Sequence, residues 1–299
     1  MRKVYLLVFL VLLVITASFA LQQRDFSKVE IKATQVSGHV YMLEGSGGNI
    51  GVSVGEDGVL IVDDQFAPLA DKIKAAIKEL GGDSPKFILN THYHGDHTGG
   101  NGQFSADGTI IAHTNVRQRL MTEQRRGDRV TPPKPKEDWP VITFDQSLSI
   151  HFNGEEVKAM HYPNGHTDGD AAIYFKGANV VHLGDDFFVG RFPFIDLDSG
   201  GSVQGLITNV EKMLTEVSPD VKIIPGHGAL STVDDLKAYL DMLKQTTSIV
   251  RKQMDDGKSL DDIKATGLSG WESWGSGFIN TERWISTIYN SYSKSMTQK

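Results

Sequence analysis

The segment 92–97, with the sequence His-Tyr-His-Gly-Asp-His, restricts the possible folds of this chain more than any other stretch. It places three imidazoles and one carboxylate directly after residues 87–89, an apolar run that predicts a buried strand. Imidazole nitrogen and carboxylate oxygen are common ligands of zinc and related metals. In extended backbone the first two histidines point the same way, and Gly95 permits a turn that brings the other two side chains from another direction. We therefore expect a metal site where this strand ends.

Four ligand candidates in six residues indicate two adjacent metals, because a catalytic zinc keeps one coordination position open. The remaining ligands must then come from elsewhere in the chain. His166, Asp185 and His227 each lie in a Gly-containing loop directly after or near an apolar strand, and such loops gather functional groups in α/β proteins. Taken singly, each could instead be a hydrogen-bonded structural histidine or a turn aspartate. His113, His161 and His182 lie within or at the ends of strands, and we interpret them as structural.

Strand-like and helical patterns alternate along the chain in two successive sets, with no stretch between them that is typical of a linker. Strands are expected at residues 40–43, 50–54, 59–62, 87–89, 109–112, 141–144, 148–152, 157–161, 171–175, 180–183 and 221–224. Helices are expected at residues 68–80, 115–124, 203–217, 233–254 and 281–289. Residues 127–140, which contain four prolines, and residues 187–201 are expected to be loops. The pattern predicts one α/β domain, a sandwich of two mixed sheets with helices outside.

The first twenty residues are expected to act separately from this domain. A short basic head, an apolar run over residues 4–15 and small residues at Ser18 and Ala20 are typical of a signal peptide cut after Ala20. An uncleaved membrane anchor is the alternative, although the apolar run is short for a span of about 20 residues. We therefore expect residues 21–299 to form the single mature domain, exported to the periplasm or outside the cell.

Composition excludes several other kinds of protein. The net charge of −7 and the lack of a basic tract argue against binding to a nucleic-acid backbone. The one cationic stretch, residues 125–129, is short and contains an acid, so a solvated loop is expected there. The absence of cysteine excludes disulfides, a thiolate nucleophile and any cysteine metal ligand.

The segment 92–97 resembles the His-x-His-x-Asp-His signature of the metallo-β-lactamase fold superfamily, and the later candidates follow in that family's order. The resemblance extends over about residues 35–230 and implies an αββα sandwich with metals at one edge between the sheets. It also implies that Asp63 makes contacts that orient the metal ligands, with Asp64 as a weaker candidate. On sequence alone, either could instead be a plain turn residue. By the family's pattern, the ligands would be His92, His94 and His166 for the first metal, Asp96, His97 and His227 for the second, and Asp185 as the bridge.

Two departures narrow the place of the chain within that family. Lactamases with a cysteine ligand carry it near the position of Asp185, and this chain has none. A bridging carboxylate there is typical of glyoxalase II-like thioesterases and lactonases. The lactamases with a cysteine ligand also have a substrate-binding lysine shortly after that cysteine. In this chain only Arg191 could approximate the charge of that lysine. The interval between Asp185 and His227 leaves no room for the extra domain usual in the nuclease branch.

The resemblance implies a hydrolase with two divalent metal ions, Zn²⁺ in the first place and iron or manganese as alternatives. A water shared by the metals would lose a proton near neutral pH and attack the carbonyl of a small-molecule lactam, lactone, ester or thioester. Asp96 would also orient the attacking group. Specificity is expected at the hairpin tip 45–48, the Pro-rich loop with Trp139, and the aromatic residues 187–194. A mononuclear iron dioxygenase of the same fold and a non-catalytic metal-binding protein are the alternatives.

Overall fold

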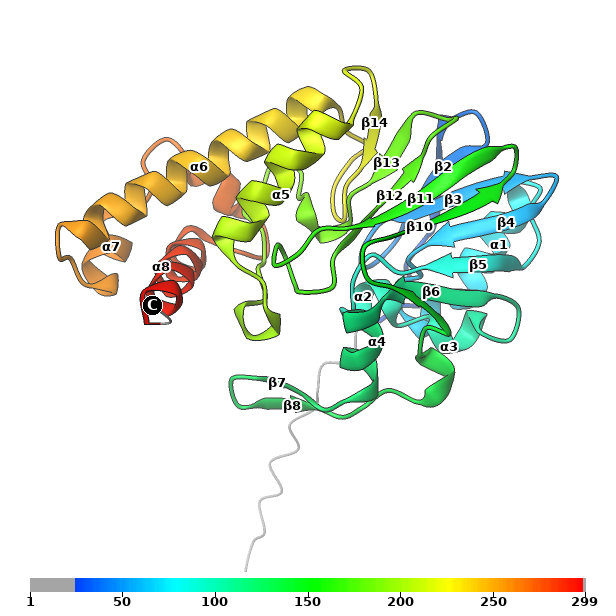
Figure 1. Cartoon of the computed structure of the whole chain (residues 1–299), viewed down its shortest axis with the longest axis horizontal. Coiled ribbons are helices and arrows are strands. Elements are labelled where there is room, and N and C mark those ends of the chain that lie inside the picture. The colour runs from blue at the N-terminus through cyan, green and yellow to red at the C-terminus, as the bar shows by residue number, and fades with distance from the viewer. Residues whose placement is uncertain (1–24, 298–299) are drawn as a thin grey trace, which may run out of the picture.

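Two β-sheets pack face to face in the computed structural model, which describes residues 25–297 (Figure 1). Helices cover the outer face of each sheet, so the expected αββα sandwich of two mixed sheets is confirmed. The signal peptide or anchor predicted for residues 1–20 lies outside the described residues. Among the helices of residues 25–297, none has the length and apolar character needed to cross a membrane.

The first sheet has seven strands in the order β1-β2-β3-β4-β5-β6-β9. Its strands are β1 (Lys32–Ser37), β2 (Val40–Glu44), β3 (Ile50–Gly55), β4 (Gly58–Val62), β5 (Pro85–Leu89), β6 (Thr109–His113) and β9 (Ile142–Phe144). The first four pair antiparallel, whereas β4, β5, β6 and β9 run parallel to one another. Because parallel neighbours end at the same edge, the loops after β4 and β5 lie side by side.

The second sheet has five strands in the order β10-β11-β12-β13-β14. Its strands are β10 (Ser147–Phe152), β11 (Glu155–His161), β12 (Ala171–Phe175), β13 (Val180–His182) and β14 (Lys222–Ile224). Only β13 and β14 pair in parallel, and the other neighbours are antiparallel. A separate hairpin consists of β7 (Gln124–Arg126) and β8 (Arg129–Thr131).

The helices fall into two groups. Those associated with the first sheet are α1 (Ala70–Glu79), α2 (Gly95–Thr98), α3 (Asn101–Phe104) and α4 (Thr114–Met121). Those on the second sheet are α5 (Val203–Glu216), α6 (Val233–Asp255), α7 (Leu260–Thr266) and α8 (Thr281–Thr297). Short 3-10 turns lie at Ala67–Leu69, Lys136–Asp138, Gly184–Asp186, Leu197–Ser199 and Glu272–Ser276. In Figure 1 the second group extends to the left of the sheets as an additional helical layer.

The three largest apolar clusters hold these layers together. The central cluster lies between the sheets and joins side chains such as Leu60 and Leu89 to Ile173 and Phe175. A second cluster packs α1 on the outer face of the first sheet, and a third packs α5, α6 and α8 outside the second sheet. Burial of these faces is the main favourable term that fixes the layers.

Most predicted elements are confirmed, but the prediction of a loop over residues 127–140 is partly wrong. Arg129–Thr131 pairs with Gln124–Arg126 as the β7–β8 hairpin, and the helix expected to reach residue 124 therefore ends at Met121. Strand β1 and helix α7 were not predicted. The side chains of β1 are exposed or only partly buried, so its sequence carries no clear period-two pattern of apolar residues.

The added helical layer should depend on one buried hydrogen bond. The Trp284 indole Nε1 donates to Thr246 Oγ1 over 2.9 Å, and both residues are fully buried. In Thr246→Val the indole N–H loses its acceptor, so we expect the free energy of unfolding to fall by about 1–3 kcal/mol. Denaturant titration measures this change. Thr246→Ser keeps the hydroxyl and serves as the control, and the prediction is wrong if the valine variant unfolds at the same denaturant concentration as the serine variant.

Candidate metal centre

The ligand candidates lie in loops that leave strands of both sheets at the same edge of the sandwich. Residues 92–97 follow β5 and run into α2, whereas Asp185 follows β13 and His227 follows β14. His166 lies in the loop between β11 and β12. The structure brings all seven predicted side chains together in two adjacent groups, within each of which the ligand atoms lie within 4.8 Å of one another. The groups are His92, His94, His166 and Asp185, and Asp96, His97 and His227.

In the first group three imidazole nitrogens point at one position. His94 Nδ1 lies 3.0 Å from His92 Nε2 and 2.8 Å from His166 Nε2. Asp185 Oδ2 lies 3.4 Å from His166 Nε2 and 3.8 Å from His92 Nε2. The four side chains are buried, so the group is closed to bulk water on most sides.

The second group shares the carboxylate of Asp185. Its other oxygen, Oδ1, lies 3.1 Å from His97 Nε2 and 3.4 Å from His227 Nε2. Asp96 Oδ2 lies 3.4 Å from His227 Nε2 and 4.0 Å from His97 Nε2. The two oxygens of one carboxylate are thus directed to different groups.

Unsatisfied buried atoms indicate what these groups can hold. His97 Nε2 and Asp185 Oδ1 are buried and lie 3.1 Å apart, yet neither is aligned for a hydrogen bond to a described residue. Buried polar atoms normally have partners, and such exceptions call for an unseen ion or water. Nitrogen and carboxylate donors at these separations suit divalent cations such as zinc. The residues therefore fit a metal.

The outward nitrogen of each buried histidine has its own partner, which orients the ring. His97 Nδ1 donates to Asp63 Oδ2 over 2.7 Å, and His166 Nδ1 donates to a backbone carbonyl, Phe194 O, also over 2.7 Å. His92 Nδ1 lies 3.1 Å from Thr91 Oγ1, which itself donates to Asp63. Asp63 therefore makes the orienting contacts that the resemblance implied.

Asp64 has a different role. Its Oδ1 accepts the backbone N–H of Gly100 over 2.8 Å, so it stabilises the turn that follows α2.

The protonation states of the side chains in the first group favour binding of a cation. Burial lowers the pKa of His92 well below its usual value and that of His94 to about 4, so both rings are neutral at neutral pH. Burial would raise the pKa of Asp185, but His227, His97 and His166 together lower it, which keeps the carboxylate charged.

In the second group, the histidines retain protons when no metal is bound. Burial opposes the charged form of His227, yet Asp185 and Asp96 raise its pKa to about 9. The pKa of His97 is likewise raised against its burial by Asp185 and Asp63. A cation that binds here therefore displaces protons.

The sequence did not identify three interacting residues at the edge of the first group. Asp196 Oδ2 accepts from His94 Nε2 over 3.0 Å, from Tyr93 OH over 2.7 Å and from Arg126 Nη2 over 2.5 Å. Asp196 is only 2% exposed. Tyr93 is adjacent to two predicted ligands, but nothing local in the sequence marks Asp196.

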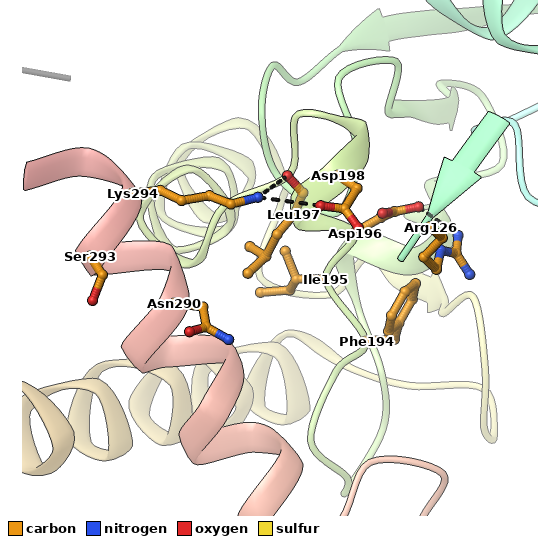
Figure 2. Close-up of a pocket in the computed structure, with 9 residues that line it drawn as sticks. All are labelled: Arg126, Phe194, Ile195, Asp196, Leu197, Asp198, Asn290, Ser293 and Lys294. Atoms are coloured by element: carbon orange, nitrogen blue, oxygen red, sulfur yellow. Dashed lines mark hydrogen bonds and ion pairs between the residues drawn. The ribbon is translucent and has the colours of Figure 1, made fainter. Parts of the chain in front are cut away.

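Within the segment 125–129, residues 125–128 are exposed as predicted, but they belong to a hairpin and not to a loop, and Arg126, 45% exposed, reaches the first group. The β7–β8 hairpin carries its guanidinium to within 3.0 Å of His94 Nε2 and over the Phe194 ring, 4.9 Å from the centroid (Figure 2). Arg191, which the sequence offered as the cation of the site, donates instead to the carbonyl of Val189 in its own loop.

Of the aromatic residues predicted around the site, Phe188 and Phe194 contact ligand candidates and Trp139 does not. Phe188 stacks on the His227 ring with centroids 5.4 Å apart, and Phe194 lies 5.7 Å from the His94 ring. Trp139 instead packs in its own segment, where its indole donates to Lys134 O.

The hairpin tip between β2 and β3 lies against the second group, and this contact can be tested. A Cβ built on Gly48 would lie 2.2 Å from His97 Cε1, whereas one on Gly95 would meet nothing within 4 Å. Gly48→Ala should displace the His97 ring and weaken metal binding at least about tenfold, because ligand position controls affinity. Equilibrium dialysis against zinc measures this. Gly95→Ala is the control, and equal zinc affinity in both variants would contradict the prediction.

Comparisons with known proteins agree with this geometry. The family model described as the metallo-beta-lactamase superfamily matches residues 43–227. The probable metallo-hydrolase YqgX of Bacillus subtilis is 32% identical over 183 residues, covering 56% of this chain and 82% of that protein. The hydroxyacylglutathione hydrolase GloC of Haemophilus influenzae is 27% identical over 184 residues, covering 56% and 86%. The fold also matches the metallo-beta-lactamase of Pontibacter korlensis with a TM-score of 0.60 at 14% identity, over 72% of this chain and 99% of that one. The family and the His/Asp groups together indicate divalent metal binding, and the hydrolase relatives indicate a small-molecule substrate. The chain belongs to the metallo-β-lactamase superfamily and is a hydrolase.

Proposed function

We propose that the chain is a zinc-dependent hydrolase with two metal ions, which cleaves the carbonyl bond of a thioester, ester, lactone or lactam. The observation that carries this proposal is the position of Asp185. Its Oδ2 faces His92 and His166, and its Oδ1 faces His97 and His227. A single carboxylate divided in this way supports two cations that lie side by side, since a closed structural site would take one ion.

The residues of the chain have distinct roles in this proposal. His92, His94 and His166 would hold one metal, and Asp96, His97 and His227 the other, with one oxygen of Asp185 available to each. Divalent metals bound there would polarise the substrate carbonyl and lower the pKa of a bound water toward neutrality.

Asp96 is the most exposed of the ligand candidates, with a side chain 31% exposed against 22% for His227. Its pKa is held low by His227 and His97 against the effect of burial, so its carboxylate is charged and can orient the attacking group.

Thioesters are the bond class that we place first. The relative from Haemophilus influenzae is named for hydrolysis of a glutathione thioester, and its match spans 86% of that protein. The lack of cysteine supports the same choice. Lactamases with a cysteine ligand carry it near the position of Asp185, whereas a carboxylate there is typical of thioesterases and lactonases.

Metal analysis together with a substrate panel tests the proposal. Purified protein should contain two zinc ions per chain by elemental analysis. It should hydrolyse a glutathione thioester faster than an acyl-homoserine lactone or a β-lactam. One iron per chain with oxygen consumption would favour the dioxygenase, and metal binding without turnover of any substrate would favour a metal carrier.

We also propose export through residues 1–20, with residues 21–299 as a single mature domain. The support is the basic head, apolar run and small residues before Leu21. Mass spectrometry of protein recovered from the periplasm should give a mature chain that begins at Leu21. A chain that retains Met1 and sediments with membranes would favour the anchor.

A further inference from the structure

The ligand candidates of the second group come from loops of both sheets. Asp96 and His97 follow β5 of the first sheet, whereas His227 follows β14 of the second. The separation between these side chains therefore depends on how the two loops are held together. Gly48 and Asn49, at the end of the β2–β3 hairpin, contact both loops.

On the side of the first sheet, Gly48 holds the hairpin against the loop of Asp96. The Gly48 N–H donates to Asp96 O over 3.0 Å, and its carbonyl accepts from Gln65 Nε2 over 2.7 Å. Gln65 is fully buried, and close packing around a buried side chain leaves it little room to move. The hairpin therefore has a set position relative to Asp96 and His97.

On the side of the second sheet, Asn49 contacts the backbone on both sides of His227. Its Nδ2 donates to Pro225 O over 3.0 Å and to Gly228 O over 2.8 Å. Its backbone N–H donates to Gly226 O over 2.8 Å. Asn49 is only 5% exposed, so water cannot easily replace these bonds. One residue of the hairpin thus fixes the loop before and after this ligand.

His182 in turn fixes the backbone of Asn49. Burial lowers the pKa of His182, so its fully buried ring is neutral and carries one proton. Nδ1 accepts the backbone N–H of Gly184 over 3.1 Å, which places the proton on Nε2, and Nε2 donates to Asn49 O over 3.0 Å. Gly184 precedes Asp185 and accepts the backbone N–H of Gly226 over 2.7 Å. The loop of Asp185 and the loop that Asn49 holds are therefore joined.

We propose that Asn49 is a positioning residue for the second metal ion. It holds the His227 loop at the distance from Asp96 and His97 that lets one cation contact all three side chains. Ligands already in place bind a cation more tightly, because less of the chain has to be ordered on binding. The inference rests on the proposed function, since it concerns the second of the two metal ions.

Zinc titration of metal-free Asn49→Ala, in competition with a chromophoric chelator, tests this role. Alanine keeps the backbone bond to Gly226 but removes both side-chain bonds, so the His227 loop can shift. We expect the Kd of the second group to rise about 10–100-fold, as is usual when the support of a metal ligand is lost. The Kd of the first group should change less than about threefold. His227→Ala, measured alongside, shows which Kd belongs to the second group.

Asn153→Ala is the matched control. Asn153 Nδ2 also donates two bonds between the sheets, to Ser53 Oγ over 2.9 Å and to Gly58 O over 3.1 Å. It lies in the turn between β10 and β11, at the edge where β4 begins and opposite the edge that carries the ligands. Its φ of 52° favours asparagine over alanine, so this variant should also lose stability in a denaturant titration. Both of its zinc Kd values should nevertheless stay within about threefold of the wild-type values.

A second variant, His182→Asn, tests the same role without changing Asn49, and it decides the question if Asn49→Ala does not fold. Asparagine Oδ1 can replace Nδ1 as the acceptor for Gly184, but the shorter side chain does not reach Asn49 O. The Kd of the second group should rise about 3–10-fold, which corresponds to the net contribution of one hydrogen bond.

The outcomes separate this inference from the proposed function. Unchanged zinc Kd values in Asn49→Ala and His182→Asn, an equal rise at both groups, or the same rise in Asn153→Ala overturns the positioning role and leaves the two-metal hydrolase intact. A wild-type chain that binds only one zinc ion contradicts the two-metal proposal and overturns the inference with it. Selective loss at the second group without turnover of any substrate supports the inference and contradicts the hydrolase.

Discussion

Replacing Asp185 with asparagine should remove most of the activity, with a fall in kcat/KM of about 10³-fold. The two oxygens of Asp185 face different histidine groups, so one neutral amide removes an anionic ligand from both. Metal ions supply several kcal/mol of transition-state stabilisation, and each 1.36 kcal/mol corresponds to a factor of ten in rate. Elemental analysis should find fewer than two metal ions per chain, and steady-state kinetics on the best thioester should show the loss.

Asp186→Asn is the matched control for this experiment. Asp186 is adjacent, also buried, and accepts the backbone N–H of His166 at Oδ1 over 3.3 Å. Burial and the neighbouring Asp170 raise its pKa well above the usual value, and asparagine has the size and the neutral charge of the protonated carboxyl that this environment favours. This variant should keep its metal content and activity within about threefold. If both variants lose metal equally, the loss results from a general disturbance of the loop, and the role given to Asp185 is wrong.

Replacing Asp196 with asparagine should weaken zinc binding by about 10–100-fold, the usual effect of removing a group that orients a metal ligand. Asp196 Oδ2 accepts the His94 Nε2 proton, which leaves Nδ1 unprotonated toward His92 and His166. A neutral amide oxygen is a weaker acceptor. Arg126 Nη2, 3.0 Å from His94 Nε2, can then donate to that nitrogen and move the proton to Nδ1, where it blocks the metal.

Two variants separate this tautomer effect from general damage. Asp198→Asn, two residues along the same segment, removes an exposed ion pair with Lys294 and should leave zinc affinity unchanged. Adding Arg126→Leu to Asp196→Asn removes the competing donor and should restore part of the affinity. Competition with a zinc chelator measures each value, and the absorption of the cobalt-substituted protein reports on the first group. No recovery in the double variant would contradict the tautomer effect.

The local sequence predicted the ligand candidates because their chemistry is concentrated in six residues and repeated at strand ends. Residues 92–97 could be interpreted without a fold, since four metal-binding side chains packed so closely after an apolar strand are typical of a metal site. His166, Asp185 and His227 were weaker signals singly, and their common position in loops at strand ends connected them. The alternating patterns also predicted two mixed sheets with helices outside, because burial of one face imposes a period on the sequence.

Arg126 and Asp196 show what local patterns do not reveal. Their contact joins residues 70 positions apart, and neither position carries a hydrophobic period or a motif. The β7–β8 hairpin that presents Arg126 consists of short, polar strands, so composition indicated a solvated loop. Helix α7 is likewise short, and its place depends on the layer formed by α6 and α8.

The amino-acid order by itself therefore determined which side chains could bind metal and which surfaces had to be buried, because both properties belong to the residues and their spacing. Only the tertiary structure decided that Asp185 faces both groups and that Asp196 orients His94. These contacts join segments far apart in the chain, and packing of the layers alone sets the distances between them.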